Sequence, residues 1–487
     1  MALSSASLLV SGSAAAQWSP EIPLTSTNSD IWGEGIATSG TTVHVVYGTS
    51  DVLYRRSKDE GATFEPEKAL DTGVIHLTDP MVADGNDVWT IYLKNLQSKT
   101  DWCCARDLGD IYLLHSGDGG DSWDAPKRLT TAQGAFRVSI AYAANQLHLV
   151  WMDFRDNVWD TYYLHSPDRG ATWDAEKVIA ASAGVFGAER PQVAARGDEV
   201  HVTIWDDRGQ NPTCMAGPFT FTVCPDTFYT RSLDGGATWG PIVPVAYSGA
   251  AFAGRNDIAV SGSSSVIVNF NRDMPGTADA NPHMFSVRSA DNGVTWDDPV
   301  QLTTSDGSSD HGSIIGDSTS VYLAWHDGRS GQLAIYFRGS KTEGATYEPE
   351  EKVSTPTDTE ASTPLVSLSD NYVHVLWLDK RTGPNQIFTR RRELLMPDPG
   401  TGGGGSGGVG GAGIGGDAAN GAGGSGMSGG GGGASGGSGG GGGDSGAESG
   451  CDCRTTGQSR TADSMMFAAL AAVGLGVHRR RVRRARG

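Results

Sequence analysis

Three arginines stand at matching places in successive stretches of the chain, each close to the start of a short apolar run. They are Arg137, Arg190 and Arg255. A guanidinium group is planar and can donate two parallel hydrogen bonds to a carboxylate, so several arginines around one site favour an anionic ligand. We therefore expect these three side chains to bind an anion or an acidic sugar.

Acidic residues occupy matching or neighbouring places in the other stretches. A carboxylate near a bound sugar can act as a general acid or base. We take Glu34 and Asp79 as candidates for this acid–base chemistry, and Asp257 and Asp310 as further substrate-binding residues. In the alternative interpretation, the arginines only neutralise an acidic rim.

The elements that position these residues are set by a repeated eight-residue turn with the pattern Ser-x-Asp-x-Gly-x-Thr-Trp. Successive copies begin 50 to 66 residues apart, at 57–64, 116–123, 166–173, 232–239, 289–296 and, in a worn form, 340–347. A repeat of this length built from short strands predicts a propeller or solenoid. The Asp and Ser side chains can accept or donate hydrogen bonds within their own turn, and Gly permits a positive φ. We expect these Asp residues to be structural, and we predict neither a metal nor a cofactor.

Alternating segments rich in Val, Ile, Tyr and Trp surround each turn and predict four antiparallel strands per unit, with the turn between the third and fourth strands. Seven units can be counted, although the last lacks a turn and a fourth strand. Residues 18–25 match the fourth-strand sequence of other units, so we expect them to pair with the last unit and close the ring. The predicted fold is an all-β, seven-bladed β-propeller over residues 17–395, with a six-bladed ring as the alternative.

In such a unit, the loops that follow strands two and four share one face, and the repeated turns lie on the other. The three arginines should therefore lie at the mouth of the central channel, away from the turns. A second motif, Trp followed by an Asp and an Arg, comes after strand two in four units, at 151–155, 205–208, 325–329 and 377–381. We interpret its Asp–Arg pairs as ties between loops of adjacent blades.

The two ends of the chain differ in composition from the propeller. Residues 396–450 are mostly Gly, Ser and Ala and predict a flexible tether. Residues 451–487 contain a Cys-Asp-Cys motif, a short apolar run and an Arg cluster, and residues 1–16 predict a signal segment. We therefore expect export, with membrane attachment only through the C-terminal segment.

Four cysteines lie outside this C-terminal segment. An even number in an exported chain suggests disulfides, with Cys214 paired to Cys224; Cys103 and Cys104 form either a vicinal bridge or an unpaired couple. Zinc is less favoured because His is absent from both loops. The formal net charge of −19 argues against nucleic acid as a partner, and we expect a monomer.

The repeated turn resembles the Asp-box (BNR) repeat of sialidases and related propellers over roughly residues 18–395. That resemblance implies a propeller, and three arginines that hold a substrate carboxylate in sialidases would correspond to Arg137, Arg190 and Arg255. The chain departs from sialidases in lacking their Arg-Ile-Pro motif near the first inner strand, and no Tyr–Glu nucleophile pair can be assigned. The C-terminal segment resembles the MYXO-CTERM sorting signal, which implies display on the cell surface.

Two functions follow as expectations. The first is an exported, surface-displayed propeller that binds a glycan and, as an exo-sialidase-like hydrolase, cleaves it. The second is a non-catalytic adhesion or scaffold protein that uses the propeller rim for protein contact.

Overall fold

The structure is a computed structural model that describes residues 17–395 apart from short gaps. The gaps are 26–30, 32, 74–75, 78–79, 101–104, 184–186, 209–213, 217–218, 222–224, 246–252, 273–280, 306, 330, 356–359 and 382. The predicted signal segment, tether and C-terminal segment therefore lie outside the described residues. None of the described residues forms a helix, and so no described helix is long and apolar enough to cross a membrane.

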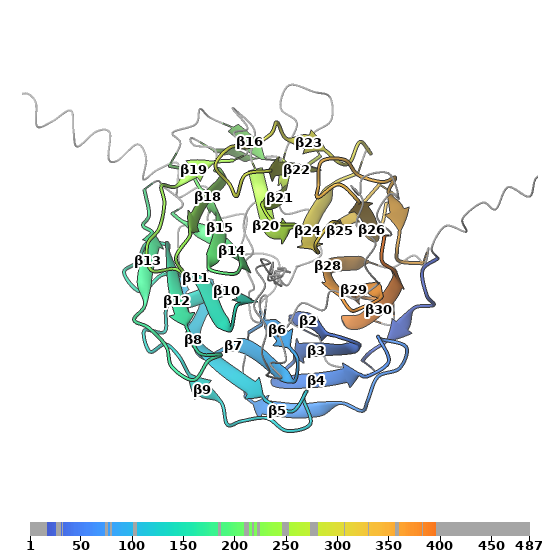
Figure 1. Ribbon diagram of the computed structural model, residues 1–487, viewed down its shortest axis with the longest axis horizontal. Helices are drawn as coiled ribbons and strands as arrows, with labels where there is room; N and C mark the ends of the chain where they lie inside the picture. Colours follow the sequence, from blue (N-terminus) through green and yellow to red (C-terminus); the bar gives the residue numbers. More distant parts are fainter. Residues whose placement is uncertain are drawn as a thin grey trace, which may run out of the picture.

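Antiparallel four-stranded sheets stand around a common axis, as predicted (Figure 1). The innermost strands are β2 (Glu34–Ser39), β6 (Met81–Asp84), β10 (Ala135–Ala143), β14 (Glu189–Arg196), β20 (Ala253–Ser261), β24 (Ser309–Gly316) and β28 (Ala361–Leu368). The second strands are β3 (Thr42–Gly48), β7 (Asp87–Thr100), β11 (Gln146–Asp153), β15 (Glu199–Asp206), β21 (Ser265–Arg272), β25 (Val321–Asp327) and β29 (Tyr372–Asp379).

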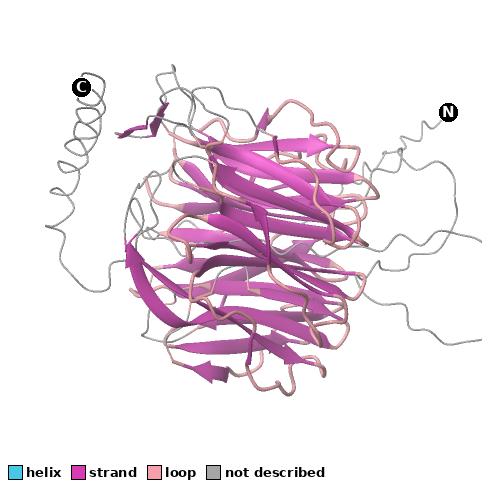
Figure 2. Ribbon diagram, turned by 90° about the vertical axis from the view of Figure 1, so that its left-hand side faces the viewer, coloured by secondary structure: helices cyan, strands magenta, loops and turns pink. Residues whose placement is uncertain are grey.

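The outer half of each sheet has a long third strand and a short edge strand. The side view in Figure 2 shows the strands crossing the molecule, with loops at both of their ends. The third strands are β4 (Asp51–Ser57), β8 (Ala105–Ser116), β12 (Asp160–Ser166), β18 (Asp226–Ser232), β22 (His283–Ser289), β26 (Ala334–Ser340) and β30 (Gln386–Glu393). The edge strands are β5 (Lys68–Thr72), β9 (Lys127–Arg128), β13 (Lys177–Ala180), β19 (Val243–Pro244), β23 (Val300–Gln301), β27 (Glu351–Lys352) and β1 (Ile22–Pro23). A small separate hairpin is formed by β16 (Cys214–Ala216) and β17 (Phe219–Phe221).

Strands β6–β13 form one eight-stranded sheet, which we divide into two units because a single pairing, Ala135 with Gly109, joins its halves. With this division, the described strands give seven four-stranded units. The division is our interpretation, so the count of seven blades stays a prediction.

The N-terminal strand completes the last sheet, as the sequence predicts. In β1, Ile22 pairs with Thr389 and Pro23 with Phe388 of β30. The sheet order β1-β30-β29-β28 therefore combines the two ends of the propeller, and β28 contacts β2 of the next sheet. Figure 1 shows this meeting point, where the orange strands lie beside the blue ones.

The core lies between neighbouring sheets, where the second strands contribute large buried side chains. Five tryptophans on these strands are almost fully buried: Trp89, Trp151, Trp205, Trp325 and Trp377. Their burial supplies much of the apolar area that stabilises the packing of one sheet on the next.

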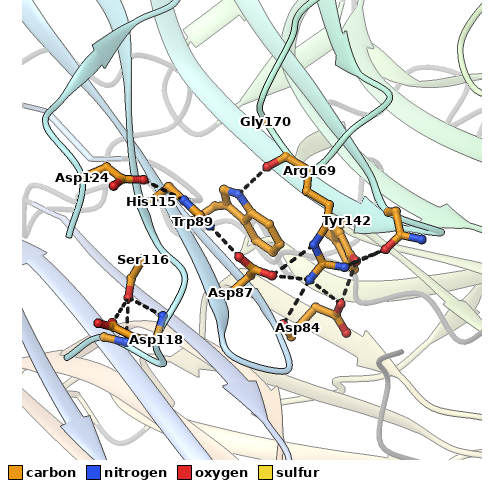
Figure 3. Close-up of polar contacts among 12 residues, drawn as sticks. Asp84, Asp87, Trp89, His115, Ser116, Asp118, Asp124, Tyr142, Arg169 and Gly170 are labelled. Atoms are coloured by element: carbon orange, nitrogen blue, oxygen red, sulfur yellow. Dashed lines mark hydrogen bonds and ion pairs between the residues drawn. The ribbon is translucent and has the colours of Figure 1, made fainter. Parts of the chain in front are cut away.

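The Asp-box turns have the hydrogen bonds and the glycine conformation that the sequence predicts. In the first, Asp59 Oδ1 accepts a hydrogen bond from the Thr63 backbone N–H at 2.8 Å, and Ser57 Oγ accepts one from Gly61 N at 2.8 Å. Gly61 has a φ of 80°, which few other residues adopt. The same contacts recur in the second turn around Ser116 and Asp118, which Figure 3 shows.

Candidate functional site

A β-bulge recurs near the start of five innermost strands. The pairing register shifts between Phe136 and Val138, between Glu189 and Gln192, between Ala253 and Asn256, between Asp310 and Ser313, and between Ser362 and Leu365. We call the residues at equivalent bulge positions the bulge row: Arg137, Arg190, Arg255, His311 and Thr363. A bulge inserts one extra residue and redirects its side chain, so the three predicted arginines share one structural position with a histidine and a threonine.

The backbone at the bulge row is in a conformation that side chains rarely adopt. The φ angles are 48° at Arg137, 50° at Arg190, 52° at His311 and 48° at Thr363. Left-handed φ values in residues other than glycine cost energy and gather at functional sites. Four such residues at equivalent positions therefore mark this end of the innermost strands as a candidate site.

The bulge row lies on the face opposite the Asp-boxes. Ala135 at the start of β10 pairs with Asp153 at the end of β11, whereas Ser166, which opens an Asp-box, pairs with Leu147 at the start of β11. The Asp-box is thus at the other end of the same sheet. The innermost strands surround the axis in Figure 1, so the row lies around one mouth of the ring.

Each arginine of the bulge row has its own neighbours. The Arg137 guanidinium carbon is 5.7 Å from the Phe136 ring centroid, and that of Arg190 is 5.4 Å from the Trp205 ring centroid. Such cation–π contacts help to hold a guanidinium group in place. The convergence of all three groups on one pocket stays a prediction.

Arg255 belongs to a compact polar cluster with residues of the next sheet, and we call it the Arg255 cluster: Arg255, Asp310, His311 and His326. The Arg255 Nη1 contacts Nε2 of His311, and its Nε lies 3.7 Å from Asp310 Oδ2. Asp310 Oδ2 is also 3.4 Å from His311 Nδ1, and the His311 and His326 ring centroids are 4.5 Å apart.

The charge states within the cluster follow from these neighbours. Burial acts to raise the pKa of Asp310, but the adjacent His311 and Arg255 outweigh it and hold the pKa well below the usual range. Burial, reinforced by His311 and Arg255, lowers the pKa of His326 to about 3. At neutral pH, Asp310 is therefore ionised and His326 is uncharged.

The cluster continues around the ring to the predicted acid–base residue Glu34. His326 Nδ1 accepts a hydrogen bond from the Thr363 backbone N–H at 3.4 Å, and Thr363 Oγ1 donates to Glu34 Oε1 at 3.0 Å. Glu34 is only 1% exposed. The other predicted acid–base residue, Asp79, lies outside the described residues.

The structure gives Asp257 a different place from the one predicted. Its side chain is fully buried and accepts hydrogen bonds from the backbone N–H groups of Ile258 and Ile314, at 2.8 and 2.9 Å. These bonds join β20 to β24 of the next sheet. We therefore replace the predicted substrate-binding role of Asp257 with a structural one, since both oxygens are engaged with backbone.

The repeated Asp–Arg pairs connect parts of one sheet, and the prediction that they tie adjacent blades was wrong. Arg155 binds Asp153 of its own loop at 2.7 Å and Glu176, just before the edge strand, at 2.8 Å. Arg329 binds Asp327 in the same way. In the second copy, Asp206 and not Asp207 is the partner of Arg208. The short spacing of the pair explains this, because a residue two positions away is within reach in the same loop.

His326 and Thr363 were not among the predicted site residues. His326 stands opposite Asp310 in the register, where equivalent pairs place the apolar Met152 and Leu378. A histidine where two other units have an apolar residue is a signal that a comparison of the repeats could have found.

Asp310, His311 and His326 also form the group of described residues whose donor atoms, all within 4.8 Å of one another, could hold a metal ion. The guanidinium group of Arg255 beside two of them opposes a cation at this place. The predicted disulfides fall on Cys103, Cys104 and Cys224 and on the side chain of Cys214, which lie outside what the structure describes.

The chain belongs to the BNR repeat-like domain family, whose model matches residues 75–375. No curated protein matches the chain.

Solved structures share the fold at low sequence identity. An ulvan lyase from a new family of polysaccharide lyases has a TM-score of 0.51 and 12% identity, over 74% of this chain and 93% of that one. The same lyase was also solved bound to -[GlcA(1-4)Rha3S]-, with a TM-score of 0.51 and 11% identity over the same shares. A sialidase of Trypanosoma rangeli has a TM-score of 0.43 and 12% identity, over 76% of this chain and 57% of that one. For the lyase, the likeness at this identity shows the fold alone.

Proposed function

We propose that this protein is an exported propeller that binds an acidic glycan at the mouth formed by the bulge row. The observation that carries the proposal is the repeated bulge, which gives Arg137, Arg190 and Arg255 the same bulge position on successive innermost strands. Guanidinium groups at one rim suit the carboxylates or sulfates of an acidic polysaccharide. The glucuronate- and sulfate-containing ligand of the structurally similar lyase supports the same ligand class.

Export and display at the cell surface are part of the proposal. They rest on the sequence of residues 1–16 and 451–487, which resembles a signal segment and a sorting signal. Protease treatment of intact cells tests this part, since a displayed propeller is digested before the cells are lysed.

The binding proposal is tested by measuring the affinity of the purified chain for acidic and neutral oligosaccharides on a glycan array. Arg190→Ala should weaken binding of an acidic glycan by about 1.5–3 kcal/mol, as expected for hydrogen bonds to a charged group. Added salt should weaken binding further if the mouth is open to solvent. Lys58→Ala is the matched control, because Lys58 is an exposed cation in the first Asp-box, on the opposite face.

An adhesion or scaffold protein would give a different result. Its partner would bind through the rim loops, and Arg190→Ala would leave that binding unchanged. Equal affinity for acidic and neutral sugars, or no difference between Arg190→Ala and Lys58→Ala, would contradict the proposal.

A further inference from the structure

We propose that three seams between consecutive four-stranded units carry an acid-sensitive latch, in which a buried histidine–tyrosine pair of one unit seats the Asp-box of the next and releases it when the histidine takes up a proton. A seam is the packed boundary between two consecutive units. The latches lie on the Asp-box face, at the other end of the sheets from the bulge row. They therefore act independently of the proposed glycan site.

The same two positions of a unit form each latch. The histidine is the third residue of the second strand, and the tyrosine lies three residues before the Ser that opens the Asp-box of its own unit. The pairs are His44 with Tyr54, His148 with Tyr163, and His201 with Tyr229. Nδ1 of the histidine lies 2.7, 2.7 and 2.6 Å from the tyrosine hydroxyl, in that order, and all six side chains are buried.

Each tyrosine seats the Asp-box of the following unit. A Cβ at the Asp-box glycine would overlap the tyrosine hydroxyl, so glycine leaves the room for it at Gly120, Gly236 and Gly293. The tryptophan that closes the same Asp-box packs its ring at a steep angle on the tyrosine ring. The ring centroids are 5.1 Å apart for Tyr54 with Trp123 and 4.9 Å apart for Tyr163 with Trp239 and Tyr229 with Trp296.

A proton on the histidine is incompatible with this closed arrangement. An imidazolium donates from both nitrogens, so Nδ1 would donate to the tyrosine oxygen and Nε2 would need a second acceptor. In His44 and His148, Nε2 is buried and has no hydrogen-bond partner among the described residues. Burial, reinforced by Arg56 beside His44 and by His165 beside His148, lowers the pKa of both to about 3. The seam must therefore open before either histidine binds a proton in mild acid.

His201 differs from the other two because a carboxylate lies near its second nitrogen. Glu199 Oε2 is 3.9 Å from His201 Nε2. Burial lowers the pKa of His201, with Arg196 and Arg231 acting in the same direction, whereas Glu199 opposes the shift. We expect this latch to respond to acid less than the other two.

The carboxylates near the latches stay in one charge state in mild acid or act on the tyrosines. Hydrogen bonds from the Ser or Thr of the same turn lower the pKa of Asp118, Asp168 and Asp234, so these Asp-box residues remain ionised at pH 5. The carboxylates that raise the pKa of a latch tyrosine, and so favour its protonated hydroxyl, are Glu65, Asp118 and Asp121 at Tyr54, Asp174 and Asp234 at Tyr163, and Glu199 and Asp291 at Tyr229.

Two other seams lack a titratable latch and provide controls within the same molecule. Trp89 and Leu113 take the equivalent places against the third Asp-box, and Ile267 and Ser286 take them against the sixth. Ser286 Oγ hydrogen-bonds the Tyr347 hydroxyl of the sixth Asp-box at 2.7 Å. These side chains gain no proton between pH 7.5 and 5.

Two further histidines lie at seams. His115 stacks on Trp89, and each of its ring nitrogens faces a carboxylate, Asp87 at 2.6 Å and Asp124 at 2.9 Å, that can accept from the protonated ring. Its protonation would therefore not open the seam at the third Asp-box. His374 adjoins Gly61 of the first Asp-box, so that Asp-box does not serve as a control.

Hydrogen exchange of the purified full chain, followed by mass spectrometry at pH 7.5 and 5, tests the latches. Exchange is corrected for the pH dependence of the chemical step, which leaves the opening equilibrium of each Asp-box. An exposed histidine has a pKa near 6.5, so opening of a seam whose histidine has a folded pKa of about 3 should become about 30-fold more favourable over this range. We expect this rise at 116–123 and 232–239, a smaller one at 289–296, and none at 166–173 and 340–347.

Variants assign the response to the histidines. His148→Gln should make the opening of 232–239 independent of pH, even if it raises the opening at both pH values, while 116–123 keeps its response. His44→Gln should give the reverse pattern. Each variant thus contains the matched control for the other, and thermal unfolding at pH 7.5 checks that both are folded.

Three outcomes would overturn the latch. A rise of equal size in all five Asp-boxes would show general destabilisation by acid. No rise at 116–123 and 232–239 would show that their seams stay closed or that their histidines are not exposed on opening. A rise at 232–239 that persists in His148→Gln, or at 116–123 in His44→Gln, would assign the response to another group.

Discussion

The guanidinium group of Arg169 lies 2.6 Å from the carboxylate of Asp87, which belongs to the preceding four-stranded unit. Arg169 is in the third Asp-box, and the same Nη2 binds Asp84 at 2.8 Å. Its backbone carbonyl accepts a hydrogen bond from the Trp89 indole N–H at 3.0 Å, and its guanidinium group also contacts Tyr142 (Figure 3). The Asp-box turn therefore fixes neighbouring four-stranded units to each other on the face away from the candidate site.

This relationship predicts that Arg169→Ala destabilises the propeller without affecting the mouth. Asp84 is 3% exposed and would lose its cationic partner, at a cost of about 1–3 kcal/mol. Urea unfolding measures this loss. Lys58→Ala, which removes an exposed ion pair with Glu65, should cost less than about 1 kcal/mol. Equal losses for the two variants would contradict the role of Arg169 as a tie between sheets.

A second prediction concerns the stability of the folded chain at acidic pH. Burial is the main cause that lowers the pKa values of His44, His148 and His374 to about 3, while an unfolded histidine has a pKa near 6.5. Because the folded values are the lower ones, the unfolded chain binds more protons as the pH falls. Stability is therefore fully present above about pH 6.5 and is lost progressively between about pH 6.5 and 3.

Thermal unfolding between pH 7.5 and 5 checks this dependence. Replacement of one buried histidine, as in His148→Gln, should flatten the decline in Tm toward acid, even if it lowers Tm overall. His115→Gln, at a half-exposed position, is the control. An unchanged slope in His148→Gln would show that the protonation of buried histidines does not limit stability.

Much of the fold could be predicted because its determinants are local and repeated. The Asp-box combines an Asp, a Gly and a hydroxyl residue within eight positions, and the hydrogen bonds of the Asp and hydroxyl side chains close within the turn. The pairing of residues 18–25 with the last sheet could also be predicted, because the segment has the sequence of an edge strand and only that sheet lacked one.

The candidate site was predicted less completely because its chemistry depends on pairing between strands. The position of Asp310 and His311 could be seen in the sequence, but the contact of His311 with His326 depends on the register of β24 and β25. Asp257 has the residue type of a ligand, yet its neighbours are the backbone N–H groups of two strands. Neither arrangement can be recognised from the spacing of residues within one stretch of the sequence.

A third prediction follows from the closure of the ring. Deletion of residues 17–25 removes β1 and leaves the outer edge of β30 unpaired, so the truncated protein should aggregate. It also removes the packing of Trp18 on Phe337, whose ring centroids are 5.1 Å apart. Light scattering and size-exclusion chromatography measure the effect, with deletion of residues 1–16 as the control. A monomeric, stable protein without residues 17–25 would contradict this closure.

The last prediction concerns the strained backbone of the bulge row. It separates the effect of a substitution on glycan binding from its effect on the free energy of unfolding. Arg190 has a φ of 50°, a conformation that costs a residue with a side chain about 1–2 kcal/mol and costs glycine almost nothing. Arg190→Ala and Arg190→Gly both remove the guanidinium group, so both should lose the acidic glycan. The two variants differ in the cost of the backbone conformation at residue 190, which alanine bears and glycine avoids. Glycine, however, has a greater unfolded-state entropy, which offsets this advantage by roughly 0.5–1 kcal/mol. The net expectation is that Arg190→Gly is more stable than Arg190→Ala by about 0.5–1 kcal/mol. At Gln192, two residues further along the same strand, the order should reverse, with Gln192→Ala more stable than Gln192→Gly. Urea unfolding of the four variants measures both differences, and the same order at both positions would show that residue 190 is not held in the left-handed region in solution.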